Sequence, residues 1–182
     1  ILPFKQKKTL KKEKLANQFL IAQNLMLNYK NGSPHIEDFM DVERLAKVYA
    51  LMSIFNTDHA TTWHNQRLYY NPINSKLEFI VYDCFSGPGT EYSRTCEIFG
   101  NDSTGINTIT NPMAYLIKNN FDDPVFLSYY LKHLKHYSST TYLDETLSEL
   151  NPAIDSLSTL LRTDYKYYQY DKNLLKSNAE KI

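Results

Sequence analysis

The residues best suited to chemistry lie on either side of a predicted β-hairpin in the middle of the chain. Asn65 comes just before the first strand, and Asp83 follows the second. A turn centred near Asn74 would place these two residues opposite each other at the open end, with Cβ atoms about 4.5–5.5 Å apart. An amide oxygen and a carboxylate at that separation can share a hard cation such as Mg²⁺ or Mn²⁺. The spacing therefore predicts a metal-binding pair.

The loop before the hairpin contains further candidates. Asp58 and His59 are candidates for a catalytic base, because a carboxylate or a neutral imidazole can accept a proton from a hydroxyl group. His64 and Arg67 flank Asn65, where they could contact a phosphate or orient the metal ligands. Together these residues indicate a site for phosphate chemistry.

Other roles are open for the same residues. His59 and His64, with Asp58 and Asp83, could bind zinc or iron in a hydrolytic site, although their spacing matches no strong metal motif. Asp83 could instead cap a turn at a strand end, and Asn65 could satisfy backbone groups in a turn.

Two helices are expected before the hairpin. Apolar residues recur at helical spacing from Leu15 to Tyr29, and Asn31–Gly32 should end that helix. Asp41 is a suitable N-cap for a second helix that should run to about Phe55. The hairpin strands are predicted at residues 67–70 and 77–82, around a turn at 71–75 that is rich in Asn, Pro and Ser.

The second half of the chain is predicted to be helical after an irregular segment at residues 84–110. Apolar spacing and Pro positions predict helices at 112–118, 124–137, 142–150, 152–164 and 165–179. The expected fold class is mainly α with a central β-hairpin, arranged as a single domain over residues 1–182.

The order of these features is similar to the large, C-terminal lobe of a protein kinase, in which a catalytic loop ends at a metal-binding Asn and a metal-binding Asp follows a hairpin. Over about residues 38–87 the chain more specifically resembles the CotH kinase family of spore-coat proteins. The segments that carry this resemblance are Asp41–Ala50, His59, Trp63–Asn65, Arg67–Pro72 and Leu77–Asp83.

The resemblance implies an atypical kinase that transfers phosphate from ATP to a hydroxyl of a protein substrate, using a divalent metal. It implies that Asn65 and Asp83 bind the metal, with Arg67 and His64 near the nucleotide phosphates. The chain also departs from the kinase pattern, because Ala60 stands five residues before Asn65, where the base Asp is usual. A catalytically inactive pseudokinase that serves as a binding module is therefore the alternative.

No Gly-rich phosphate loop and no Val-Ala-Ile-Lys strand occur in the sequence. The first residue is not Met, and we expect the chain to be part of a longer protein whose small, N-terminal lobe is missing here. Tyrosine-rich chains are common at cell surfaces, which slightly favours an exported bacterial protein. A cytoplasmic location is also open.

The 182 residues carry equal numbers of basic and acidic side chains, so no net field recruits nucleic acid or an anionic membrane. No apolar run approaches the length of a membrane span. Six lysines cluster within residues 5–14 and are expected to form a solvated helix face, or a contact for phosphate or a neighbouring segment. Cys84 and Cys96 could pair if the protein is exported or be two buried thiols if it is not, and the unpaired state is slightly favoured. His133 and His136 are expected to lie at the surface without an acidic partner.

Overall fold

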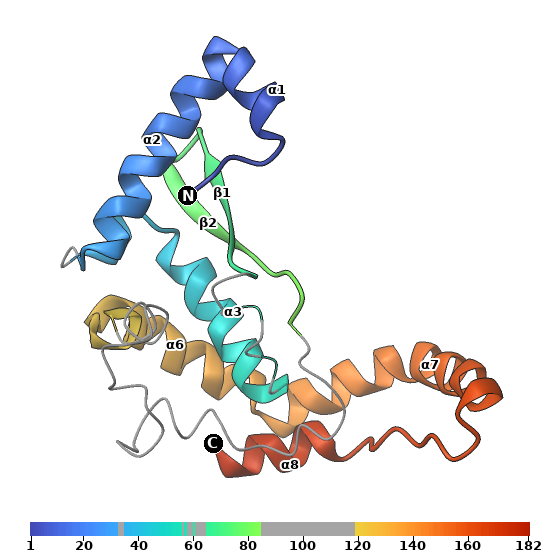
Figure 1. Ribbon diagram of the computed structural model, residues 1–182. Helices are drawn as coiled ribbons and strands as arrows, with labels where there is room; N and C mark the ends of the chain where they lie inside the picture. Colours follow the sequence, from blue (N-terminus) through green and yellow to red (C-terminus); the bar gives the residue numbers. More distant parts are fainter. Residues whose placement is uncertain (33–34, 56, 58–59, 61–64, 85–118) are drawn as a thin grey trace, which may run out of the picture.

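The computed structural model describes residues 1–32, 35–55, 57, 60, 65–84 and 119–182. This part of the chain is mostly helical with one antiparallel hairpin, as the sequence predicts (Figure 1). The elements are, in chain order, α1 (Gln6–Lys11), α2 (Glu13–Lys30), the 3₁₀ helix η1 (Ile36–Asp38), α3 (Val42–Phe55), β1 (Arg67–Asn71), β2 (Lys76–Ile80), α6 (Pro124–Tyr137), α7 (Thr140–Asp164) and α8 (Leu174–Lys181).

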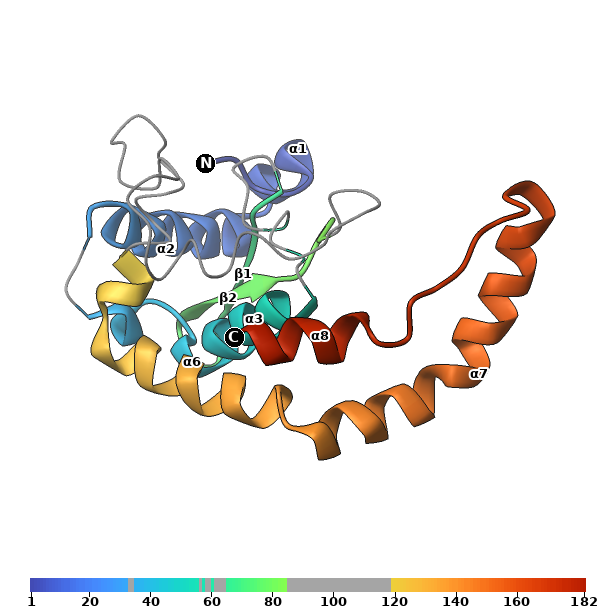
Figure 2. The same ribbon diagram turned by 90° about the horizontal axis from the view of Figure 1, so that it is seen from below.

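Helices α3 and α6 form the centre of the molecule, where they pack side by side (Figures 1 and 2). Helix α3 begins after Asp41, whose carboxylate accepts the backbone N–H of Arg44, as expected of an N-cap. Between α3 and α6 the rings of Tyr49 and Phe126 meet edge to face with centroids 5.5 Å apart. Aromatic contacts of this kind add to the area that the core buries, and they fix the pairing of the two helices.

A carboxylate secures the start of α6 within this core. Asp123 is its N-cap and accepts the backbone N–H of Phe126 at 2.8 Å, while its second oxygen accepts the N–H of Ile36 at 3.3 Å. One buried side chain thus satisfies the free N–H group of a helix end and ties it to a segment 87 residues earlier.

The hairpin is attached to the first residues of α3 through its second strand. Leu77 donates to the carbonyl of Phe39 and accepts from the N–H of Asp41, both at 2.8 Å. Leu77, Glu78 and Phe79 of β2 are buried, with Leu77 and Phe79 in the hydrophobic core. The short two-stranded sheet is therefore supported by helix packing and by main-chain bonds to the segment before α3.

Two helix predictions in the second half are wrong. Residues 142–150 and 152–164 were expected as separate helices, but α7 runs through Pro152 without a break. A proline inside a helix removes one backbone hydrogen bond and usually bends the helix. The turns on both sides of Pro152 nevertheless remain helical. Residues 165–173 are not helical, because the chain leaves the helical conformation at Tyr165 and turns back, with Arg162 donating to the carbonyl of Tyr168.

The last helix returns to the centre of the molecule (Figure 2). Leu175 of α8 is in the core, and the buried Asn178 donates its side-chain amide to the carbonyl of Ile54 at 3.0 Å. Ile54 lies in the last turn of α3, where carbonyl groups have no partner within the helix. Helix α8 therefore caps α3 from outside. In the described part of the chain, no helix is both long and apolar enough to cross a bilayer.

Candidate functional site

Asn65 and Asp83 are in contact at the open end of the hairpin, through the side chain of Asn65 and the main chain of Asp83. Asn65 is buried, with 4% of its surface exposed, and its Nδ2 donates to the main-chain carbonyl of Asp83 at 3.5 Å. Asp83 is exposed and has a φ of 49°, in the left-handed region that Asp adopts more readily than most residues. The contact therefore positions the main chain of Asp83 and leaves its carboxylate at the surface.

The predicted register of the hairpin is wrong by one residue. Asn71 pairs with Lys76 and Arg67 pairs with Ile80, so the turn is a four-residue loop centred between residues 73 and 74. Extending this ladder would bring Tyr82, not Asp83, opposite Asn65. The cause lies in the loop, where the side chains of Asn71 and Asn74 accept backbone N–H groups two residues on and fix the turn.

Arg67 and Tyr82 lie beside this pair. The guanidinium of Arg67 stacks over the Tyr82 ring at 4.9 Å from its centroid, and it also donates to the carbonyl of Gln66. Stacking on an aromatic face restricts the orientation of a guanidinium group. Arg67 is thus near the residue that precedes Asp83, as a phosphate contact of this site requires.

The carboxylate of Asp83 also affects the neighbouring cysteine. Partial burial, followed by the Asp83 charge, raises the pKa of the Cys84 thiol above its usual value. Cys84 is a free thiol, which agrees with the prediction, whereas Cys96 lies outside the described residues. A raised pKa disfavours the thiolate, which is the reactive form of a cysteine.

The other predicted site residues cannot be placed. Asp58, His59 and His64 lie outside the described residues, and with them both histidines of the zinc or iron hypothesis. Ala60 is described and is fully buried. The position five residues before Asn65 therefore holds a small apolar side chain inside the core, which can neither accept a proton nor contact a substrate.

The donor atoms at this end of the hairpin fit a hard cation in type. A carboxylate, a side-chain amide and a main-chain carbonyl supply only oxygen donors, which Mg²⁺ and Mn²⁺ prefer. In the part of the chain that the structure describes, no group of three His, Cys, Asp or Glu side chains is placed to bind a metal. A cation here would depend on Asn65 and Asp83, with its remaining ligands from water and phosphate oxygens.

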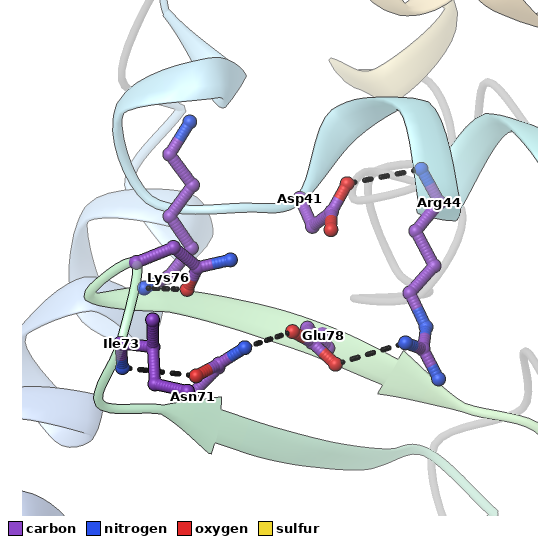
Figure 3. A network of polar contacts seen from close by, with 7 residues as sticks. Asp41, Arg44, Asn71, Ile73, Lys76 and Glu78 are labelled. Atoms are coloured by element: carbon purple, nitrogen blue, oxygen red, sulfur yellow. Dashed lines mark hydrogen bonds and ion pairs between the residues drawn. The ribbon is translucent and has the colours of Figure 1, made fainter.

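A polar network that the sequence did not reveal fixes the hairpin against α3 (Figure 3). Glu78 of β2 accepts from Nδ2 of Asn71 at 2.7 Å and pairs with Nη1 of Arg44 at 3.0 Å. Only 11% of the Glu78 side chain is exposed, so the pair is partly shielded from water. The one signal in the sequence is an acidic residue in an otherwise apolar strand, since a buried carboxylate requires a partner.

His133 is the clearest error among the predicted surface residues. Its side chain is 9% exposed, and its Nε2 lies 3.3 Å from Oε1 of Glu43. The ring also stacks between Tyr129 and Tyr137, one turn before and after it on α6. Sequence spacing could not show the acidic partner, because Glu43 is 90 residues away on α3.

A second buried polar group also escaped prediction. The side chain of Asn120 is fully buried, and its Oδ1 accepts the hydroxyl of Tyr29 at 2.8 Å. Burial raises the pKa of the Tyr29 hydroxyl well above its ordinary value, so it remains a neutral donor. This bond links α2 to the residues just before α6.

Comparison with models of protein families, with curated proteins and with solved structures finds no match to this chain.

Proposed function

We propose that this chain is the large-lobe part of a CotH-like atypical kinase, which transfers a phosphoryl group from ATP to a Ser or Thr hydroxyl of a protein substrate. The supporting observation is the contact between Asn65 and Asp83 at the open end of the β1–β2 hairpin. In kinases an amide and a carboxylate in this place bind the cations that bridge the nucleotide phosphates.

Each candidate residue has a role in this proposal. The oxygen atoms of Asn65 and Asp83 would hold Mg²⁺ or Mn²⁺, which neutralises phosphate charge when bound. Arg67, oriented by its contact with Tyr82, would bind a phosphate oxygen. A small lobe from elsewhere in the same protein would cover ATP.

The proton of the attacking hydroxyl requires a separate acceptor. Asp58 is the first candidate and His59 the second, with His64 orienting the residues around the metal. As the hydroxyl oxygen bonds to the γ-phosphorus, the bond to ADP breaks and the hydroxyl proton passes to this base.

An inactive pseudokinase is a second candidate function, and the burial of Ala60 favours it. The usual position of the base then contributes only to packing. Such a domain would retain the scaffold, and it would bind a protein partner or a nucleotide without transferring phosphate. The two functions differ in chemistry and can share a nucleotide site.

The proposal is tested on the full-length protein by its melting temperature with ATP and Mg²⁺ or Mn²⁺. A ligand that binds only the folded form stabilises it by mass action, by about 2.7 kcal/mol at a hundred times the Kd. Absence of any increase with ATP and metal would refute nucleotide binding. If the temperature rises, labelled ATP and a Ser-containing acceptor separate the two functions, because only a kinase transfers the label.

A further inference from the structure

The first fourteen residues combine exposed basic and exposed apolar side chains. Four apolar residues here are exposed, with Leu2 at 77% and Phe4 at 83% of their surface and Ile1 and Leu10 near half. The same segment, which we call the basic arm, contains one glutamate and six lysines, all exposed: Lys5, Lys7, Lys8, Lys11, Lys12 and Lys14.

The basic arm gives a neutral chain a strong local charge. Six lysines and Glu13 leave residues 1–14 with a side-chain charge of +5, so the other residues must together carry −5. Within the described residues, none of the six lysines forms an ion pair with a carboxylate. The ammonium group of Lys5 lies over the ring of Phe4, 5.4 Å from its centroid.

The fold presents this charge at one end of the molecule. Helix α1 folds back beside the first residues of α2, which places the basic arm far from α7 and α8 (Figure 1). Helix α7, at the other end, contains five acidic residues and only one basic residue, Arg162. An anionic surface would therefore attract one end of the protein and repel the other.

We propose that residues 1–14 bind the surface of a membrane that contains anionic lipid. The lysines would contact headgroup phosphates and carboxylates, while Leu2 and Phe4 enter the boundary of the acyl chains. Exposed apolar side chains favour lipid over nucleic acid, since a nucleic-acid backbone offers them no apolar phase to enter. This inference does not depend on the proposed kinase activity.

Cosedimentation of the protein with vesicles tests the proposal. We expect binding to vesicles of phosphatidylcholine and phosphatidylserine at about 7:3, weak binding to pure phosphatidylcholine, and loss of binding in high salt. Lys7→Glu with Lys8→Glu and Lys11→Glu should lower the partition coefficient by about a hundredfold or more, since each lysine contributes about fivefold. Phe4→Ser should lower it by about tenfold.

Matched variants control for charge and apolarity elsewhere. Lys135→Glu with Lys166→Glu changes exposed lysines outside the basic arm, and Leu157→Ser removes an exposed apolar side chain of α7; both should bind vesicles as the original protein does. Equal binding to neutral vesicles, or full binding by the triple Lys variant, would overturn the proposal. So would tight binding to duplex DNA that Phe4→Ser leaves unchanged, or a salt-sensitive dimer that forms without vesicles and requires the three lysines.

Discussion

The side-chain amide of Asn65 donates to the main-chain carbonyl of Asp83 at 3.5 Å, across the open end of the hairpin. The bond acts on the main chain of Asp83 and not on its carboxylate. Substitutions at these two positions should therefore have different effects, which separates a binding role from a structural one.

Asp83→Asn should abolish metal-dependent nucleotide binding without loss of stability. Asn adopts the left-handed conformation of residue 83 at least as readily as Asp, so the free energy of unfolding should change by less than about 0.5 kcal/mol. The uptake of Mn²⁺ in the presence of ATP, followed by electron paramagnetic resonance, should be lost in the full-length protein. Mn²⁺ uptake equal to that of the original protein would exclude Asp83 as a metal ligand.

Asn65→Ala is the structural counterpart of this variant. It removes a buried amide that holds the main chain of Asp83, and we expect a loss of about 1–2 kcal/mol in urea unfolding together with loss of Mn²⁺ uptake. Comparison of the two single variants thus distinguishes a carboxylate that only binds metal from an amide that also supports the fold.

Removal of Arg44 should destabilise the hairpin through Glu78. In Arg44→Met the Glu78 carboxylate keeps only the bond from Asn71 and is largely shielded from water. We expect a loss of about 1–2 kcal/mol, which is less than for a fully buried pair because Arg44 is more than half exposed. Urea unfolding of both single variants and of Arg44→Met with Glu78→Gln measures the coupling, which should be at least about 0.5 kcal/mol.

The exposed pair of Lys47 and Glu43 provides the control for this cycle. Both side chains are 40% exposed or more, and Lys47→Met should change the unfolding free energy by less than about 0.5 kcal/mol. Additive effects of the Arg44 and Glu78 variants would show that their ion pair does not stabilise the hairpin.

His133 should make the protein less stable in mild acid. Burial, which Lys47 and Lys132 reinforce and Glu43 opposes, lowers the pKa of His133 in the folded state below 6.5. As the pH falls, the unfolded chain therefore binds the proton at a higher pH than the folded protein does. The contribution of His133 to the free energy of unfolding is fully present above about pH 6.5, and it is lost as the pH falls toward the folded-state pKa. Urea midpoints between pH 7.5 and 5.5 should decline, and His133→Phe should flatten this dependence.

His136→Gln is the matched control, because His136 is exposed on the same helix. It should leave the pH dependence unchanged. Glu43 does not produce the same slope: burial raises its pKa, but Lys47, His133 and Lys132 together lower it below 4.5, so its contribution changes only at more acidic pH. A stability that rises on acidification from pH 7 to 6 would contradict the assignment to His133.

Pro152→Ala should stabilise the protein and straighten α7. Alanine restores the N–H group that a helix interior requires and removes the steric conflict of the proline ring, which together are worth up to about 3 kcal/mol. We expect a gain of about 1–3 kcal/mol, measured as a higher urea midpoint. Ala153→Gly, one residue later, should lower stability by about 1 kcal/mol. A destabilised Pro152→Ala variant would show that the bend itself is required.

Local patterns were sufficient for the elements that have strong periodicity. The end of α2 at Asn31, the start of α3 after Asp41 and the bounds of α6 agree with the sequence, because capping residues and apolar spacing act over a few residues. The prediction failed where a local signal was overridden. Pro152 stays inside a helix, and the Tyr-rich segment after Asp164 turns back without forming one.

The candidate site was predictable in outline only. The neighbourhood of Asn65 and Asp83 follows from a hairpin, but the register depends on side-chain bonds of Asn71 and Asn74 that no propensity encodes. The charged partners of His133 and Glu78 are Glu43 and Arg44 of α3, so they could not be found before that helix was placed. Whether the site transfers phosphate remains a prediction from the motif.

The cap that Asn178 provides for Ile54 has a consequence during synthesis of the protein. The two residues are 124 positions apart, so at about 5–20 residues per second the ribosome completes Asn178 some 6–25 seconds after Ile54. Throughout that interval the carbonyl of Ile54 lacks the side-chain partner that it has in the folded protein, whereas the Met52 carbonyl of the same turn can already accept the N–H of Thr57. The central helix of the domain is thus synthesised well before the residue that completes its end.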